Sequence, residues 1–109
     1  MAVYFIQESA AGYIKIGTGC PYNRMRAMST GNPWELKILK IIDGSYKEEG
    51  VVHRIFSKDR LYSNREWFRP SKELLLFINS RRETIYKNIK VAGKYLEDHP
   101  KHTFHFAEI

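Results

Sequence analysis

Several residues of this chain have side chains that could act on a phosphate ester. They are, in chain order, Tyr4 with Lys15, Arg24 with Arg26, Glu49 with His53, and Glu66. A carboxylate binds a hard cation such as Mg²⁺ through oxygen, and the cation neutralises charge on a phosphate. An arginine offers a planar fork of donors to phosphoryl oxygens, and a phenol or amine can orient or deprotonate a water. These residue types together suit phosphodiester hydrolysis.

A β-hairpin is predicted to position the first two of these residues. Side chains of a strand alternate between its two faces, and the apolar positions 3, 5, 14 and 16 suit the buried face. We therefore expect Tyr4, Tyr13 and Lys15 to lie together on the opposite face of the hairpin.

The next two elements are predicted from helix breakers and alternation. Pro21 suits the first position of a short helix over residues 21–29, and Gly31 with Pro33 ends it. Residues 36–42 read as a third strand.

The second helix carries the acidic candidate. Ser45 and Glu48 form a capping-box signature, which predicts a helix over residues 46–57. Its buried stripe is expected at positions 52, 55 and 56. Glu49 and His53 are four residues apart and should share one face of this helix.

A long amphipathic pattern follows Ser71 and continues to Leu96. The spacing of its apolar residues fits either one helix or two helices that separate near Asn79 and Ser80. Residues 102–106 are predicted to form a final strand.

Composition limits the class of protein. The chain has 109 residues, 43% hydrophobic and 14% aromatic, which suits a single domain with a small core. Its net charge of +6 favours polyanionic partners. The single cysteine, Cys20, excludes an internal disulfide and a cysteine-based zinc site. No apolar run is long enough to span a bilayer, so we expect a soluble, cytoplasmic protein with no membrane partner.

Five segments, in order, resemble the GIY-YIG endonuclease superfamily. Ala2-Val3-Tyr4 and Lys15-Ile16-Gly17 are similar to its two signature motifs and have the spacing that the family prefers, although Ala2 replaces the first glycine. The segment 23–33, the pattern Glu49-x-x-x-His53-x-x-Phe56 and the segment Glu66-Trp67-Phe68 resemble a phage and bacterial branch whose second motif is Lys-Ile-Gly. The resemblance covers roughly residues 2 to 78.

The resemblance implies both a fold and an activity. The fold would be α/β of the α+β kind, with a small, mainly antiparallel sheet of about three strands flanked by helices. A nuclease domain would span residues 1–80, and a C-terminal helix and tail over residues 81–109 would pack on the same domain. The activity would be endonucleolytic hydrolysis of nucleic acid, expected to be DNA, with Mg²⁺ or Mn²⁺ as cofactor.

The resemblance also implies roles for individual residues. Tyr4 would be the general base or water-positioning residue, Arg24 would stabilise the phosphate, and Glu49 would be the sole protein ligand of the metal. Lys15 replaces the family's second tyrosine, so it would hold a phosphate or stabilise a tyrosinate. His53 could be a second metal ligand, a phosphate donor or a core histidine.

Other basic residues are expected to contact the nucleic-acid backbone outside the site, namely Arg26, Arg65, Arg81 and Arg82. For Glu66, Trp67 and Phe68 a structural role is favoured. Two alternatives stay open: a non-catalytic module on the same fold that binds nucleic acid, nucleotide or protein, and a homodimer through the C-terminal helix.

Overall fold

A four-stranded antiparallel sheet lies at the centre of the molecule. The computed structural model describes residues 1–31, 33–61 and 66–100, and within these ranges the chain is an α+β protein with four α-helices. The elements are β1 (Ala2–Glu8), β2 (Ile14–Gly19), α1 (Pro21–Ser29), β3 (Leu36–Asp43), α2 (Tyr46–Ile55), the short 3₁₀ turn η1 (Ser57–Asp59), β4 (Trp67–Phe68), α3 (Lys72–Asn79) and α4 (Arg82–Asp98).

The strand order β3-β1-β2-β4 places β1 in the interior of the sheet. Tyr4 in β1 lies opposite Gly17 in β2 and opposite Ile41 in β3. The fourth strand adds to the three that were predicted. It pairs only with Ile14 and Lys15, so the rest of β2 has no strand partner on its outer side among the described residues. A strand of two residues is too short for alternation to reveal it.

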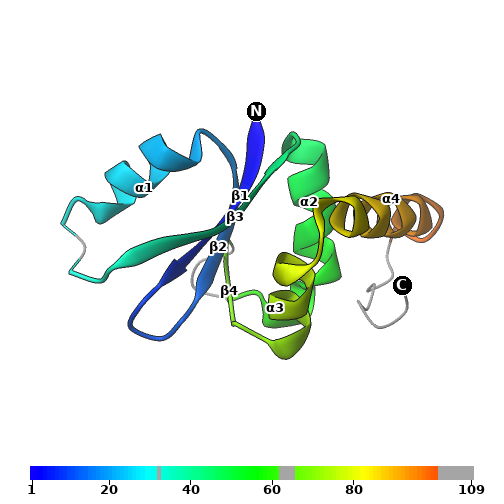
Figure 1. Cartoon of the computed structure of the whole chain (residues 1–109). Coiled ribbons are helices and arrows are strands. Elements are labelled where there is room, and N and C mark those ends of the chain that lie inside the picture. Colours follow the sequence, from blue (N-terminus) through cyan, green and yellow to red (C-terminus); the bar gives the residue numbers. More distant parts are fainter. Residues whose placement is uncertain (32, 62–65, 101–109) are drawn as a thin grey trace.

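The helices cover both faces of the sheet, with α1 on one side and α2, α3 and α4 on the other (Figure 1). The hydrophobic core lies between the sheet and the second group. It includes the predicted inward residues of both strands and the predicted stripe of α2, all buried: Val3, Phe5, Ile14, Ile16, Val52, Ile55 and Phe56. Helix α4 adds Ile85, Ile89, Ala92 and Leu96 to the same core, so the C-terminal helix packs on this domain.

The other face of the hairpin differs from the prediction. Tyr4 and Ile6 are also buried, because α1 packs against β1 and β3. Tyr13 lies in the turn before β2, where its N–H donates to Glu8 Oε1 at 2.7 Å. It is four residues from Gly17, about 13 Å along an extended chain. Tyr13 therefore lies further along the hairpin from Tyr4 than Lys15 does, and its place on the same face stays a prediction.

The helix starts follow the predicted signals. Helix α1 has the predicted bounds, and α2 begins at Tyr46 behind a complete capping box. Ser45 Oγ accepts from the Lys47 N–H at 3.2 Å, and Glu48 Oε2 accepts from the Ser45 N–H at 2.7 Å. Helix α2 ends at Ile55, two residues before the expected end, because the chain turns into the 3₁₀ turn there.

The C-terminal pattern forms two helices rather than one. Ser71 Oγ caps α3 by accepting from the Leu74 N–H, and Ser80 and Arg81 have extended backbone angles that separate α3 from α4. The strand predicted over residues 102–106 lies outside the described residues. None of the helices in the described ranges is long and apolar enough to cross a bilayer.

The capping box should contribute measurably to stability. We expect Ser45→Ala to lower the free energy of unfolding by about 1 kcal/mol in urea titrations at neutral pH, because the Lys47 N–H loses its acceptor and Glu48 loses the hydrogen bond from the Ser45 hydroxyl. The Ser45 hydrogen bonds lower the pKa of Glu48, so this contribution is present above the carboxyl's ordinary pKa and should shrink as the pH falls through the lowered value. Ser29→Ala, at an exposed site on α1, is the matched control and should change stability by less than about 0.5 kcal/mol.

Candidate functional site

The ring of Tyr4 lies directly over Gly17. A Cβ built on Gly17 would lie 2.5 Å from Tyr4 Cζ and closer still to Oη, a separation that real Cβ atoms do not show. The backbone of Gly17 has no positive φ, so the glycine is required for close approach and not for its conformational freedom. Without a side chain at this position, the phenol can extend across β2 toward the strand's outer edge.

The hydroxyl of Tyr4 is available to a ligand although its ring is buried. The residue is 2% exposed, and the structure gives Oη no hydrogen-bond partner among the described residues. Every fully buried side-chain nitrogen or oxygen in that part of the chain has such a partner, so Oη must reach solvent. Tyr4 therefore has an apolar ring packed in the protein and a polar hydroxyl that water or a ligand can reach.

Charged residues from separate elements act on this phenol. Burial is the largest cause that raises the pKa of Tyr4 above its ordinary value, and the Arg24 guanidinium opposes it. The Glu66 and Glu49 carboxylates raise the pKa further, and the Tyr46 phenol does so last. Arg24 from α1 and Glu49 from α2 thus lie within electrostatic reach of Tyr4, and so does Glu66.

Arg24 lies beside the end of β2, whereas Arg26 faces another side of α1. A Cβ built on Gly19 would lie 4.0 Å from Arg24 Nε, so the guanidinium group lies near this glycine, whose φ is +139°. Both arginines are exposed on α1. Residues two apart on a helix do not face each other, so α1 directs only one of the pair to the site.

Glu49 is oriented by a hydrogen bond from the sheet. Its Oε1 accepts from Thr18 Oγ1 at 2.8 Å, and Thr18 is buried in β2. In the described part of the chain, Oε2 of Glu49 has no hydrogen-bond donor. The carboxylate is half-buried, with one oxygen fixed by the protein and the other open to a ligand.

The donor set suits a cation that keeps most of its water. No group of three or more His, Cys, Asp and Glu residues that could hold a metal is present in the described ranges. Mg²⁺ is commonly bound by only one or two carboxylates and retains several waters. The open oxygen of Glu49 therefore fits Mg²⁺ or Mn²⁺, and it does not fit a structural zinc site, which needs four protein ligands.

Lys15 is paired with Glu66. Its Nζ lies 2.5 Å from Glu66 Oε2 and 5.8 Å from the centre of the Trp67 ring. The hydrogen bond from Lys15 is the largest cause that lowers the pKa of Glu66, so the carboxylate stays ionised. Sequence reasoning favoured a structural role for Glu66, whereas the structure places its charge beside Tyr4.

His53 is held by both ring nitrogens. Nε2 lies 2.9 Å from the Ile16 carbonyl oxygen, which can only accept, so Nε2 carries the proton and Nδ1 accepts from Arg60 Nη2 at 3.3 Å. Burial lowers the pKa of His53 and keeps the ring neutral. Among the three roles left open by the sequence, this geometry matches the buried histidine.

The other predicted nucleic-acid contacts lie away from Tyr4 or outside the described residues. Arg81 and Arg82 are exposed at the start of α4. The neighbouring Ser80 carbonyl accepts from Lys40 Nζ at 3.1 Å, which places this helix start beside β3, across the sheet from the outer edge of β2. Arg65 lies outside the described residues.

Comparison with known proteins found no family model, no curated protein and no solved structure that matches this chain. The resemblance to GIY-YIG nucleases thus depends on the sequence motifs alone.

The close approach of Tyr4 to Gly17 predicts an unusual cost for a small substitution. We expect Gly17→Ala to lower the free energy of unfolding by about 1 to 3 kcal/mol, because the new methyl group must displace the phenol. Gly50→Ala is the matched control: nothing lies within 4 Å of a Cβ there, and it should stabilise α2 by about 0.5 to 1 kcal/mol. In a Tyr4→Ala background the cost of Gly17→Ala should largely disappear, and an unchanged cost would contradict the contact.

The electrostatic cluster can be tested by titrating Tyr4. We expect Arg24→Gln to raise the pKa of Tyr4 further, because the guanidinium that stabilises the phenolate is removed. The measurement is an alkaline titration followed by NMR of ¹³Cζ-labelled tyrosine. Arg26→Gln removes the same charge from α1 on another side and should leave that pKa unchanged. Equal shifts in the two variants would show that Arg24 is not specifically directed at Tyr4.

Proposed function

We propose that this protein is a Mg²⁺- or Mn²⁺-dependent endonuclease of the GIY-YIG type that hydrolyses phosphodiester bonds in DNA. The observation that carries the proposal is the unpaired hydroxyl of the buried Tyr4, which reaches solvent within electrostatic reach of Arg24 and Glu49. A phenol, a guanidinium and an open carboxylate oxygen are together the groups that a phosphodiester and its attacking water require.

Glu49 would hold the cation in this proposal. The Thr18 hydroxyl fixes one carboxylate oxygen and leaves the other to bind the metal, which supplies positive charge that stabilises the phosphate as its negative charge grows. His53 has its ring nitrogens committed to Ile16 and Arg60, so we assign it to positioning α2 against β2 and not to the metal.

Tyr4 and Arg24 would act on the water and the phosphate. Burial keeps the phenol protonated near neutral pH, so in the resting protein Tyr4 orients a water or phosphate oxygen by hydrogen bonding instead of removing a proton. The exposed Arg24 guanidinium can turn toward phosphoryl oxygens and offers two parallel donors. Lys15 does not replace a phenol in this arrangement, because its ammonium group holds Glu66.

One observation favours a second candidate, a non-catalytic nucleic-acid-binding module on the same fold. Lys15 stands where the family has its second tyrosine, and its ammonium group is paired with Glu66. A basic chain with such a site could bind a phosphate without cleaving it. A homodimer through α4 remains a prediction that sedimentation velocity would check.

The nuclease proposal predicts that activity depends on Glu49. We expect wild-type protein to nick or linearise supercoiled plasmid with Mg²⁺ or Mn²⁺ and not with chelator. Glu49→Gln keeps an oxygen for Thr18 but loses the charge, and it should lower the cleavage rate by about 10² or more. Glu83→Gln, in the exposed first turn of α4, is the matched control and should cleave normally.

Two outcomes would contradict the nuclease proposal in different ways. Equal cleavage by wild type and Glu49→Gln would remove Glu49 from the mechanism. Oligonucleotide binding in chelator together with no cleavage under any divalent metal would favour the non-catalytic module.

A further inference from the structure

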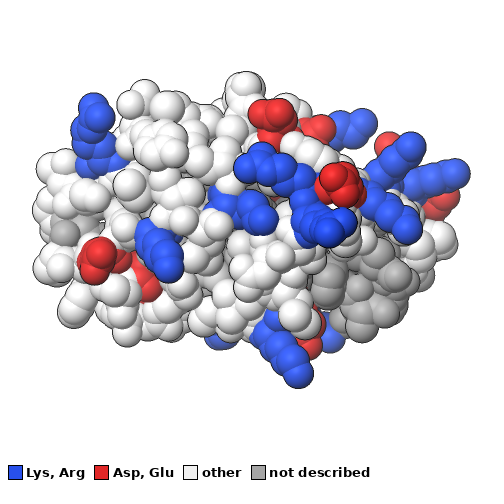
Figure 2. Space-filling model, viewed as in Figure 1, with Lys and Arg blue, Asp and Glu red and all other residues white. Residues whose placement is uncertain are grey.

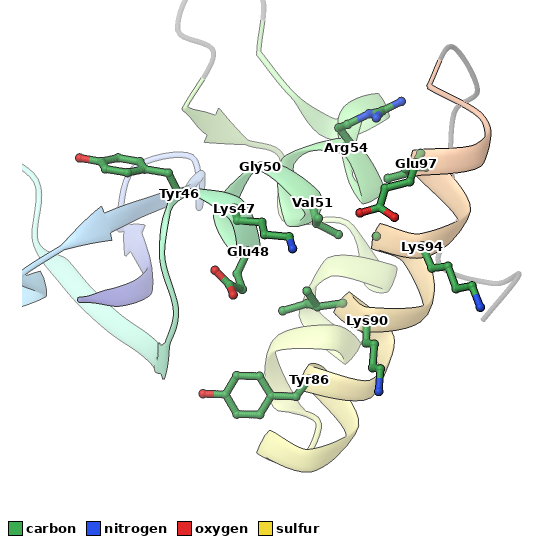
Figure 3. Close-up of a pocket in the computed structure, with 13 residues that line it drawn as sticks. Tyr46, Lys47, Glu48, Gly50, Val51, Arg54, Tyr86, Lys90, Lys94 and Glu97 are labelled. Atoms are coloured by element: carbon green, nitrogen blue, oxygen red, sulfur yellow. The ribbon is translucent and has the colours of Figure 1, made fainter.

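A second feature, separate from the candidate site, is a groove between α2 and α4. Its volume is about 860 Å³, and neither Tyr4 nor Glu49 lines it (Figure 3). Helix α2 contributes residues from Tyr46 to Arg54, and α4 contributes residues from Tyr86 to Glu97. Nothing in the proposed hydrolysis uses this groove.

Gly50 on α2 and Gly93 on α4 line the groove. Nothing lies within 4 Å of a Cβ built on Gly50, although glycine in a helix costs about 1 kcal/mol relative to alanine. A Cβ built on Gly93 would lie 3.5 Å from Val51, which is an ordinary contact distance. On α2, position 50 therefore has room for a larger side chain.

Basic residues predominate along the groove. Four basic side chains line it, against two acidic ones: Lys47, Arg54, Lys90 and Lys94 against Glu48 and Glu97. The carboxylate of Glu48 is engaged by the Ser45 N–H and hydroxyl, so part of the acidic charge is directed at the helix cap. Figure 2 shows Lys and Arg side chains gathered over the half of the molecule that holds α2 and α4.

Exposed tyrosines lie at the end of the groove that faces the sheet (Figure 3). Tyr46 is 66% exposed and Tyr86 is 37% exposed. The hydroxyl of Tyr86 donates to the Asp43 carbonyl oxygen at 3.0 Å, which holds the ring in place. Tyr46 begins α2 one turn before Glu49, so this end of the groove lies close to the candidate site along the helix.

We propose that the groove binds a single-stranded segment of nucleic acid that flanks the bond to be cut. This inference rests on the proposed function, because it supplies that site with a path for its substrate. Basic rims follow a phosphate backbone, and exposed aromatic rings stack on unpaired bases, whose faces are hidden in a duplex. A second copy of α4 suits the groove less well, because Lys90 and Lys94 would meet the same charges.

Binding to a fluorescein-labelled oligothymidylate of about a dozen nucleotides, followed by fluorescence anisotropy in chelator, tests the groove apart from cleavage. We expect Gly50→Leu, which fills the groove without changing charge, to weaken binding about tenfold. The pair Lys90→Gln and Lys94→Gln should also weaken binding and reduce the slope of log affinity against log salt by about 1.4. The matched pair Lys58→Gln and Lys72→Gln, exposed and outside the groove, should change the slope by less than half of that.

The outcomes separate this inference from the nuclease proposal. Loss of binding in both groove variants but not in the control pair supports the groove even if no metal gives cleavage. Unchanged binding in the groove variants overturns the groove, and plasmid cleavage by the same protein would leave the nuclease proposal standing. A duplex of the same length that binds as tightly as the single strand would overturn the single-stranded assignment. If the protein is a dimer and Gly50→Leu dissociates it, a second copy of the chain occupies the groove, and the single-stranded assignment is overturned.

Discussion

The candidate site depends on the close approach of the Tyr4 ring to Gly17. The antiparallel register of β1 and β2 sets this contact, because residues opposite each other share a face. A slip of one residue would turn Tyr4 into the core and put Phe5 on the α1 side, so the packing of the core face fixes the position of the phenol. Position 17 therefore has to be glycine for a steric reason. Lys15, two residues earlier, pairs with Glu66 instead.

Because β4 begins at Trp67, opposite Lys15, the outer side of Ile16 pairs with groups from other parts of the chain. Ile16 presents its N–H and carbonyl oxygen to the outer side of β2, where a longer fourth strand would pair with them. The Glu66 carbonyl oxygen accepts from that N–H at 3.1 Å, and His53 Nε2 donates to the carbonyl oxygen. These two hydrogen bonds hold His53 of α2 and the backbone of Glu66 at the same edge of the sheet. The side chains of Glu49 and Glu66 are positioned at that edge as a result.

Sequence patterns predicted the features of the fold that depend on residues close together in the chain, such as helix starts. Pro21 and Ser45 marked the starts of α1 and α2 correctly, because a missing N–H and a capping hydroxyl act within one turn. The bond from Thr18 to Glu49 joins residues 31 positions apart, and the pair of Lys15 and Glu66 spans 51 positions. No local signal marks such pairs. The covered second face of β1 was missed for the same reason, since only packing by α1 reveals it.

The pair of Lys15 and Glu66 affects the electrostatics of the site. A free carboxylate at Glu66 would raise the pKa of Tyr4 more strongly, and the paired ammonium group partly cancels that effect. The Arg24 guanidinium favours the phenolate, and its side chain is exposed. The charge on Glu49 also raises the pKa of Tyr4, after burial and Glu66. A cation bound at the open oxygen of Glu49 would oppose that effect, so cation binding and the acidity of Tyr4 would be coupled through this one carboxylate.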